Sequence, residues 1–542
     1  MNLGRLLTQA RRRIPSAPAI SQGARTLSYA DFDDRSDALA HALADRGLRQ
    51  GDRVAVLLAN APELLETMFA CFKAGYGFVP LNAKFRPDEV SYHLQDSGAA
   101  ALVVDAAGGD VAVQADTGDT ALIAVGDPRD GFAEYESLVQ GATGRGSVAV
   151  DVDRDDVAWL FYTSGTTGRP KGAILTHGVL DFVTASWLAD LTPMDERSVT
   201  LHAAPLTHGA GFHALATTAR GAHHVLTPAG SFDPAGILAL MRSAGVTCTW
   251  LVPTQIVMLT DHLAGRRADL PGLRHIVYGG AAFAPADLKV ALEVFGPRLV
   301  QLYGQGETPM TATVLPPEDH ASALAGDRSE RLASAGFARP GMDVRIHDGD
   351  DRELPAGEVG EVVVRGPAVM TGYWQRPAET AAALRHGWLH TGDLGRMDER
   401  GYVYLLDRAK DMIISGGSNV YAVEVEAVLT EHPAVREVAV VGVPDRTWGE
   451  LVVAVVVPEE RADQPDRPLA VASPELTGQW EAHCREQLAT YKRPRRYVLL
   501  DALPRNAYGK VPKRVLREQL AQQAATQQDL TQQDSTQNGS TT

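Results

Sequence analysis

The stretch Arg53-Val-Ala-Val-Leu-Leu58 is an apolar run of the kind that forms a buried β-strand. Residues 61–74 then carry apolar side chains at helical spacing, and Gly77-Phe-Val-Pro-Leu81 predicts a second strand. A strand, a helix and a strand in this order favour an α/β fold that is built on parallel sheets.

Segments on both sides of this stretch continue the alternation. Residues 29–46 predict a helix, and further strand candidates lie at residues 101–104, 157–162, 246–252, 275–278 and 299–303. From Asp343 onward, short strands alternate with Gly, Asp and Pro turns, as in Val359-Gly-Glu-Val-Val-Val-Arg365. A β-rich portion is therefore expected after the main sheets.

A second, smaller unit begins beyond residue 411. Helices are predicted at residues 422–430 and 474–488, the latter with Ser473 as its N-cap, and strands at residues 435–443 and 451–457. We therefore predict a large N-terminal domain of two α/β sheet subdomains plus a β-rich subdomain, and a small mobile α+β C-terminal domain. The bounds that we expect are residues 1–406 for the large domain, 407–411 for a hinge, 412–520 for the small domain and 521–542 for a disordered tail.

Composition limits the classes of partner. The formal net charge of -16 argues against a broad nucleic-acid-binding surface, which needs a positive footprint. Cys71, Cys248 and Cys484 show no metal-ligand spacing, and we expect buried thiols. We find no signal-peptide pattern and no apolar run of transmembrane length, so we expect a cytoplasmic protein.

One loop has the composition of a phosphate-binding site. Its residues are Thr163, Ser164, Gly165, Thr166, Thr167 and Gly168, followed by Lys171. Glycines let the backbone N–H groups approach a phosphate closely, while the hydroxyls and the lysine complete the shell. The loop follows a predicted strand, at whose carboxyl end α/β sheets bind ligands, but it does not fit the G-x-x-x-x-G-K-[ST] spacing. A run of Ser, Thr and Gly alone is more typical of a polar surface turn.

The complete string Tyr162-Thr-Ser-Gly-Thr-Thr-Gly-Arg-Pro-Lys-Gly172 resembles the signature of the adenylate-forming superfamily. That family includes acyl-CoA synthetases, firefly luciferases and peptide-synthetase adenylation domains, and the chain looks closest to bacterial fatty-acid–CoA ligases. The resemblance runs from about residue 25 to residue 517 and recurs in the family's order at several separate motifs. It implies ATP and CoA as co-substrates and Mg²⁺ as the metal.

The resemblance also implies a role for each matched residue. Three residues are implied to be catalytic: Lys510, His208 and Glu307. Lys510 would act at the transferred acyl group, and His208 would lie in the acyl and thiol tunnel. Glu307 and Thr163 are the implied Mg²⁺ ligands. The implied ATP- and AMP-binding residues are Thr163 to Gly168, Lys171, Gly280, Ala281, Tyr303, Gly304, Gln305, Gly306, Glu307, Asp393 and Arg408. The acyl pocket is implied at His208, Gly209, Phe212, Val252, Gly279 and Gly280, the CoA channel at Ser415, Gly416 and Gly417, and the hinge at Lys410.

One position departs from the family's pattern, which is Tyr-Gly-x-Thr-Glu. Gly306 stands where a threonine hydroxyl would contact phosphate, and Thr308 is a candidate replacement. Glu307 remains the expected Mg²⁺ ligand, because a carboxylate beside ATP phosphates repels them unless a cation intervenes.

We therefore predict an AMP-forming carboxylic acid–CoA ligase. The carboxylate would attack the α-phosphorus of ATP, and the thiol of CoA would then displace AMP from the acyl-adenylate. Small or apolar residues around the expected pocket, including Ala210 and Trp250, favour a fatty or aryl acid. Three alternatives stay open: loading of a carrier protein, luciferase-like oxidation of the adenylate, and a non-catalytic nucleotide or acyl sensor. Formation of a homodimer is left open as well.

Overall fold

The computed structural model describes most of the chain. Its described ranges are residues 2–163, 169–228, 230, 232–408, 411–415, 418–445, 447–459, 470–506 and 511–523. Some predicted site residues lie outside these ranges: Ser164, Gly165, Thr166, Thr167, Gly168, Lys410, Gly416, Gly417 and Lys510. Most of the predicted tail, residues 524–542, lies outside them too.

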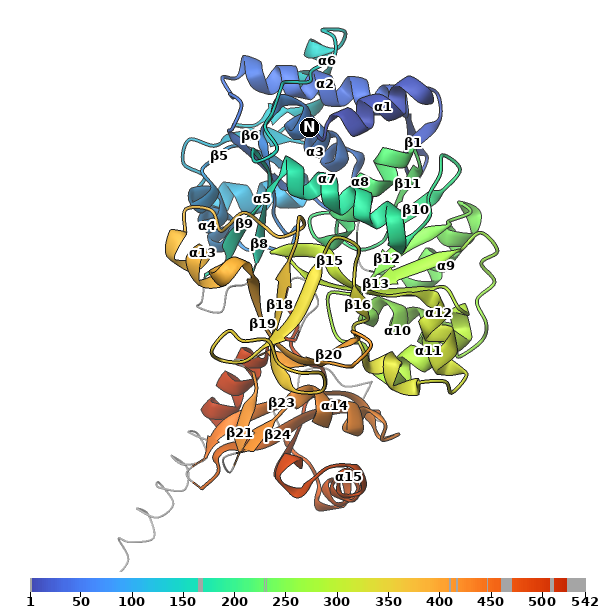
Figure 1. The fold of residues 1–542 in the computed structure, drawn as a ribbon. Coiled ribbons are helices and arrows are strands. Elements are labelled where there is room, and N and C mark those ends of the chain that lie inside the picture. Colours follow the sequence, from blue (N-terminus) through green and yellow to red (C-terminus); the bar gives the residue numbers. More distant parts are fainter. Residues whose placement is uncertain are drawn as a thin grey trace, which may run out of the picture.

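The predicted α/β fold class is confirmed, because two large sheets dominate the described residues (Figure 1). The first sheet has the order β7 (Ala133–Glu134), β6 (Ala121–Ala124), β5 (Ala99–Val104), β3 (Arg53–Leu57), β4 (Gly77–Pro80), β8 (Val157–Thr163) and β9 (Lys171–Thr176). The second has the order β16 (Phe337–Ala338), β15 (Thr308–Leu315), β14 (Leu299–Gln305), β13 (His275–Tyr278), β12 (Cys248–Leu251), β10 (Val199–His202), β11 (His223–Leu226), β1 (Pro18–Gln22) and β2 (Arg25–Ser28).

Strands inside both sheets run parallel, as predicted, and so does β7 at one edge of the first sheet, but strands at the other edges run antiparallel. β8 pairs antiparallel with β9, β14 with β15, and β1 with β2. The cause is the length of the connections. Only Gly306 and Glu307 separate β14 from β15, whereas a parallel pair needs a crossover of about a dozen residues or more.

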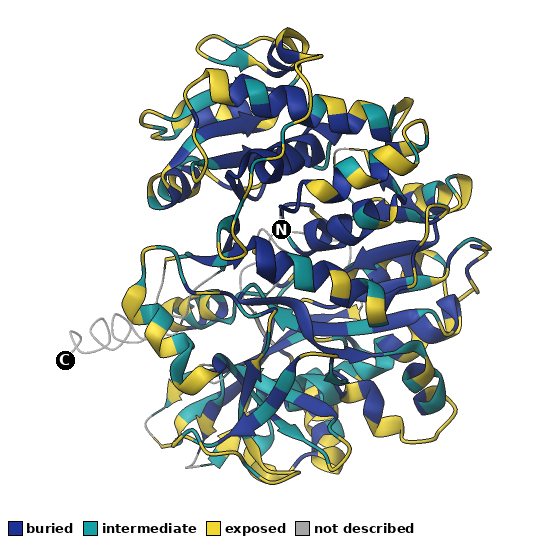
Figure 2. Cartoon of the chain, turned by 45° about the horizontal axis from the view of Figure 1, so that its top comes forward, coloured by how far each residue is buried: buried dark blue, intermediate teal, exposed yellow. Residues whose placement is uncertain are grey.

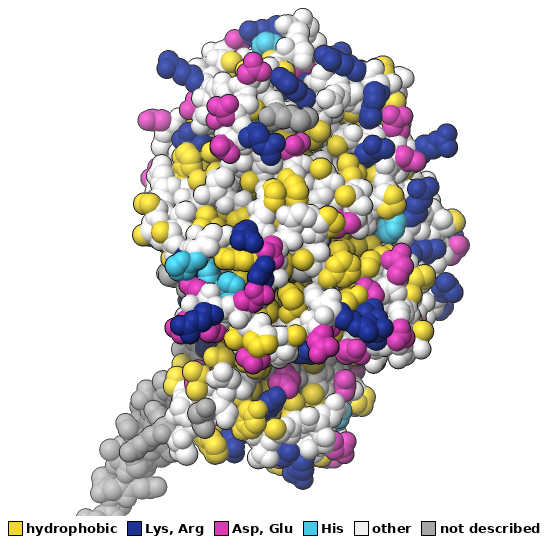
Figure 3. Space-filling view, in the orientation of Figure 1, with side chains coloured by type: hydrophobic (Ala, Val, Ile, Leu, Met, Phe, Trp, Pro, Cys, Tyr) yellow, Lys and Arg dark blue, Asp and Glu magenta, His cyan; other side chains and the backbone are white. Residues whose placement is uncertain are grey.

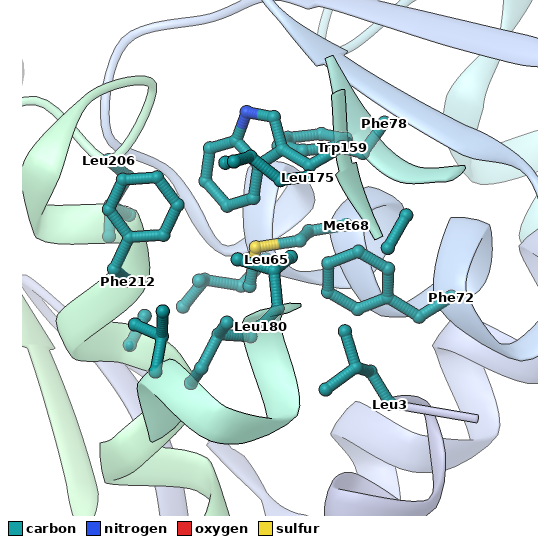
Figure 4. Packing of buried hydrophobic residues seen from close by; sticks show 14 of the residues in the cluster. Leu3, Leu65, Met68, Phe72, Phe78, Trp159, Leu175, Leu180, Leu206 and Phe212 are labelled. Atoms are coloured by element: carbon teal, nitrogen blue, oxygen red, sulfur yellow. The ribbon is translucent and has the colours of Figure 1, made fainter. Parts of the chain in front are cut away.

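Three helices lie between the two sheets: α3 (Pro62–Ala74), α7 (His177–Ser186) and α8 (Gly209–Arg220). Every residue of α3 is buried, and this helix contacts β3 of the first sheet and β1 of the second. Figure 4 shows Met68 of α3 beside Trp159 of β8, with Phe72 of α3 on one side and Phe212 of α8 on the other. One continuous apolar layer therefore joins the two sheets.

The other helices of the large domain bury one face and expose the other (Figure 2). They are α1 (Arg5–Arg13), α2 (Tyr29–Asp45), α4 (Pro87–Ser97), α5 (Ala106–Gln114), α6 (Tyr135–Ala142), α9 (Pro234–Ser243), α10 (Pro253–His262), α11 (Pro285–Phe295) and α12 (Pro317–Leu324). Acidic and basic side chains are interspersed over the face in Figure 3, with apolar side chains between them. The negative net charge is thus not gathered into one patch on that face.

A four-stranded antiparallel sheet follows the two large sheets, as the sequence predicted. Its order is β17 (Asp343–His347), β18 (Val359–Arg365), β19 (Leu389–Met397) and β20 (Val403–Arg408), with α13 (Pro377–Ala383) between β18 and β19 in the chain. In Figure 1 this sheet lies between the large sheets and the small C-terminal domain.

The small C-terminal domain has its own sheet and its own buried clusters. The sheet has the order β22 (Ser418–Val420), β21 (Ile413–Ser415), β24 (Gly449–Pro458), β26 (Arg496–Leu499) and β25 (Ala470–Val471), and β23 (Val435–Asp445) also pairs with β24. Its helices include α14 (Ala422–Thr430) and α15 (Pro474–Gln487). The Ser473 hydroxyl accepts a hydrogen bond from the backbone N–H of Leu476, so the predicted N-cap is confirmed.

Two further features bear on the sequence predictions. Cys71, Cys248 and Cys484 are buried free thiols, as expected. Across the described ranges, every helix is too short or too polar to cross a bilayer.

Burial of α3 brings a lysine into the core. Lys73 is fully buried, and its Nζ lies 2.6 Å from Asp33 Oδ1 and 2.7 Å from Asp37 Oδ1. Both aspartates belong to α2, where a spacing of four residues puts them on one face. The pair thus fixes α2 against the helix that joins the sheets.

We expect Lys73→Met to lower the free energy of unfolding of the large domain by about 3–5 kcal/mol, because buried Asp37 loses its cation and buried Asp33 keeps, among the described cations, only Arg11, at 3.4 Å. Arg242→Met is the control, since it removes an exposed ion pair with Asp269 and should change little. Urea unfolding followed by tryptophan fluorescence measures both. Equal effects of the two substitutions would show that the Lys73 pair does not hold α2 to α3.

Candidate functional site

A large cavity opens at the carboxyl edge of the second sheet. Its volume is about 1050 Å³. Lining residues follow β10, β11, β12 and β13 or end β14, for example Ala203, Thr227, Val252, Gly280 and Gln305. The carboxyl ends of parallel strands are where α/β sheets bind ligands.

Many predicted site residues meet at this cavity. Those that line it are His208, Gly209, Phe212, Val252, Gly280, Ala281, Gly304, Gln305 and Gly306. Gly279 does not line it. A Cβ atom on Gly279 would lie 2.5 Å from the Leu302 carbonyl oxygen, so this glycine lets β13 end close to β14. Ser415 is buried in β21 of the small domain and does not line the cavity either.

Large side chains crowd the part of the cavity beside His208. The Phe161 and His208 rings lie 5.1 Å apart between centroids. A Cβ atom on Gly209 would lie 2.3 Å from Met310 Cε and 3.0 Å from the Trp250 ring, so glycine is needed here for space. Met310 itself has a φ of 58° in an irregular part of β15, a strained conformation of the kind that clusters at functional sites. Sequence analysis did not single out Phe161 or Met310.

Asp393 is the centre of a hydrogen-bonded cluster next to the cavity. Its Oδ2 accepts from the Tyr303 hydroxyl and from Gln305 Nε2, both at 2.6 Å. Arg408 Nε lies 2.7 Å from Oδ1, because Asp393 and Arg408 are direct partners across β19 and β20. Burial, and then the charge of Asp393, raise the pKa of the Tyr303 hydroxyl well above its usual value. Burial acts to lower the pKa of Arg408, but the neighbouring acidic groups, Asp393 first, raise it overall.

Glu307 forms a second cluster, at the turn between β14 and β15. Its Oε1 accepts from the Thr163 hydroxyl at 2.8 Å and from the Tyr373 hydroxyl at 2.7 Å. Thr163 ends β8 of the first sheet, so this contact brings the carboxyl edges of the two large sheets together. A carboxylate and a threonine hydroxyl are oxygen ligands of the type that Mg²⁺ takes. The Thr163 oxygen keeps lone pairs while it donates its proton, so these residues fit the metal.

Residues of α4 anchor the ends of the predicted phosphate loop. The Tyr162 hydroxyl donates to Asp96 Oδ2 at 2.8 Å, and the Tyr92 hydroxyl donates to the Pro170 carbonyl at 2.5 Å. Thr163 and Lys171 are direct partners in the β8–β9 ladder, so the loop is the connection of an antiparallel hairpin. Sequence analysis missed Tyr92 and Asp96, which lie far from the loop in the chain.

The space beside Gly306 is filled by two residues of β8. A Cβ atom on Gly306 would lie 2.3 Å from Thr163 Cγ2 and 2.6 Å from Phe161 Cδ1. Gly306 does not have a positive φ, so space alone requires the glycine. Thr308 is fully buried and does not line the cavity, so in this structure its hydroxyl does not take the position of the missing threonine hydroxyl.

A carboxylate suited to Mg²⁺ and a large cavity at the carboxyl edge of a sheet are features of an enzyme that binds a nucleotide. Comparisons with known proteins agree with this class. Residues 7–374 match the AMP-binding enzyme family, and residues 424–510 match the AMP-binding enzyme C-terminal domain.

Individual relatives cover nearly the whole chain. A feruloyl-CoA synthase of Amycolatopsis sp is 39% identical over 520 residues, which are 95% of this chain and 99% of that protein. The fatty acid–[acyl-carrier-protein] ligase ScoC of Streptomyces coeruleorubidus is 36% identical over 511 residues, 93% of this chain and 94% of that protein. The solved structure of ATP-bound MatB from Rhodopseudomonas palustris has a TM-score of 0.82 at 33% identity, covering 96% of this chain and 99% of that one.

The chain belongs to the AMP-binding enzyme family. It is an AMP-forming acid–CoA ligase that uses ATP, Mg²⁺ and CoA, as the sequence predicted.

We expect Gly306→Ala to lower the free energy of unfolding of the large domain by about 1–3 kcal/mol, because the new methyl overpacks against Thr163 and Phe161. Gly141→Ala, at an exposed position of α6 where a Cβ would meet nothing within 4 Å, should have little effect. Gly306→Thr restores the residue typical of the family and should still lower both stability and the rate of ATP–pyrophosphate exchange. A rise in both the stability and the exchange rate would mean that Thr163 and Phe161 do not fill the space beside residue 306.

Proposed function

We propose that the ligase activates an acid whose only charge is its carboxylate and whose remainder is apolar, either fatty or aryl. The observation that carries this proposal is the composition of the cavity wall next to Gly304, Gln305 and Gly306. That wall consists of Phe161, His208, Gly209, Phe212, Trp250, Val252, Leu302 and Met310. Apart from His208, none of these described residues has an ionisable side chain, whereas Lys84, His223, Asp233 and Arg505 also line the cavity. A second charge on the substrate would be buried there without a partner, which is costly.

The N-terminus of α8 supports the orientation of the acid. His208 is the N-cap residue of this helix, and both His208 and Gly209 line the cavity. The helix dipole places partial positive charge at this end, which favours the substrate's carboxylate. The acid therefore binds with its carboxylate toward His208 and the nucleotide side, and with its apolar part along Phe212 and Trp250.

In the first reaction the carboxylate oxygen attacks the α-phosphorus of ATP, forming the acyl-adenylate and releasing pyrophosphate. Because both reactants are anions, catalysis depends on position and on neutralisation of charge. Glu307 and Thr163 would hold the Mg²⁺ ion, which would supply positive charge to the phosphates when bound. The loop at residues 163–168 and Lys171 hold the phosphates, and Lys510 stabilises the negative charge that develops in the transition state.

The Asp393 cluster binds the nucleoside part. Three donors hold the Asp393 carboxylate in one orientation, and its remaining lone pair accepts from a ribose hydroxyl. Tyr303 lies against the base, and Arg408 contacts the ribose or the phosphate. These roles rest on the family resemblance together with the cluster geometry.

In the second reaction the thiol of CoA attacks the acyl carbonyl, and AMP leaves with the electron pair of the broken acyl–oxygen bond. The small domain, residues 412–520, rotates about Lys410 within the hinge at 407–411 and brings Ser415, Gly416 and Gly417 to the thiol. In the present arrangement Arg505 of the small domain lines the cavity. This arrangement fits the first reaction. We place the enzyme in the cytoplasm. One chain supplies all the residues of each active site, whether or not the enzyme forms a homodimer.

A panel of acids tests the substrate class. The measurement is kcat/KM for pyrophosphate release with CoA and ATP present. The best fatty or aryl acid should exceed dicarboxylic or amino acids of similar size at least about 100-fold. That ratio corresponds to about 2.7 kcal/mol, a modest cost for a buried unpaired charge. A dicarboxylic or amino acid as the best substrate would contradict the proposal.

Lys510→Ala should abolish adenylate formation but leave thiolysis of pre-made acyl-AMP largely intact, because Lys510 acts only on the first transition state. ATP–pyrophosphate exchange measures the first step, and CoA-dependent release of AMP from synthetic acyl-AMP measures the second. Exchange that persists near the wild-type rate would rule out the assigned role.

A carrier protein is the second candidate for the acyl acceptor, since the relative ScoC is named as an acyl-carrier-protein ligase. Product analysis with CoA or a phosphopantetheinylated carrier as the sole acceptor separates the two. Faster transfer to the carrier at equal thiol concentration would favour the carrier.

A further inference from the structure

Tyr373 contacts the phosphate-loop region through its backbone. It forms an antiparallel bridge with Ala173 of β9, and the next residue, Trp374, donates its backbone N–H to the Gly172 carbonyl at 2.8 Å. β9 begins at Lys171, the residue where the predicted phosphate loop ends. The main chain therefore places Tyr373 beside the exit of that loop.

The Tyr373 hydroxyl acts on one oxygen of Glu307. It donates to Oε1 at 2.7 Å, and the Thr163 hydroxyl donates to the same atom at 2.8 Å. The backbone N–H of Met370 also donates to the Glu307 carbonyl at 2.8 Å. No residue in the described part of the chain donates to Oε2, so the two hydroxyls fix the carboxylate from one side and leave its other oxygen for a cation.

The Tyr373 ring acts on Lys171. The Lys171 Nζ atom lies 4.4 Å from the ring centroid, in cation–π contact. One half-buried side chain therefore touches both the carboxylate that is suited to Mg²⁺ and the cation that follows the phosphate loop. Glu307 and Lys171 have opposite charge, and yet they do not form an ion pair with each other in this structure.

We propose that Tyr373 is a positioning residue that holds Glu307 for the metal and Lys171 for the phosphates of ATP. This inference rests on the proposed function of Glu307 and Lys171. The hydroxyl orients Oε2 toward the metal, and the ring keeps the ammonium group from pairing with Glu307 instead of with a phosphate.

The chain offers a matched control for the loss of this hydroxyl. Tyr402 donates its hydroxyl to Asp319 Oδ2 at 2.7 Å, and the Arg331 guanidinium lies 4.3 Å from its ring centroid. Tyr402 thus has the same pair of contacts as Tyr373, a carboxylate and a cation, but it precedes β20 and does not line the cavity.

The test compares Tyr373→Phe with Tyr402→Phe. The readout is the dissociation constant of Mn²⁺, which is added in place of Mg²⁺. α,β-Methylene ATP is present as an unreactive analogue of ATP. The electron paramagnetic resonance signal of free Mn²⁺ gives the dissociation constant. Tyr373→Phe should raise that constant about 10- to 100-fold, the usual effect of losing a hydrogen-bond partner of a metal ligand. Tyr402→Phe should leave it unchanged, although both substitutions should lower thermal stability to a similar extent.

A third substitution separates the ring from the hydroxyl. Tyr373→Leu also removes the contact with Lys171, so KM for ATP at saturating metal should rise beyond its value in Tyr373→Phe. Wild-type Mn²⁺ affinity in Tyr373→Phe, or an equal loss in Tyr402→Phe, would overturn the proposal. Failure of the proposed function looks different: the wild type would then show no acid-dependent ATP–pyrophosphate exchange, whereas the Mn²⁺ comparison needs no acid and no turnover.

Discussion

In the proposed function, the repulsion between the Glu307 carboxylate and a triphosphate is the constraint on which the site depends. Glu307 adds a further negative charge, and the structure supports it from one side only. Thr163 and Tyr373 both donate to Oε1, while Lys171 lies against the Tyr373 ring and Arg408 is paired with Asp393.

The fold serves this constraint by bringing two sheet edges to one point. Thr163 ends a strand of the first sheet, and Glu307 sits in the turn that follows β14 of the second, so their hydrogen bond spans the two. That meeting depends on the layer between the sheets, where α3 is buried on all sides and its lysine is neutralised by α2. A change in the spacing of the sheets would separate Thr163 from Glu307 before it disturbed either strand.

Most of the fold could be predicted from patterns of consecutive residues in the sequence. Strand and helix segments agree with the structure to within two residues at each end, because their apolar periodicity is a local property. The antiparallel edges were not predicted, since strand direction depends on the length of a connection such as Gly306–Glu307. Residues Tyr373, Tyr92 and Asp96 were missed because their contacts are distant in the chain, and Tyr373 lies 66 residues from Glu307. Gly306 was noticed as a lost hydroxyl, whereas the structure shows that Thr163 and Phe161 occupy its space.

In the proposed first reaction, the acid's own carboxylate oxygen attacks the α-phosphorus of ATP. Turnover of an apolar acid labelled with ¹⁸O in both carboxylate oxygens, with CoA present, tests it directly by mass spectrometry of the products. Each AMP should then carry one ¹⁸O atom, and pyrophosphate should carry none. Unlabelled AMP, or label in pyrophosphate or phosphate, would contradict it.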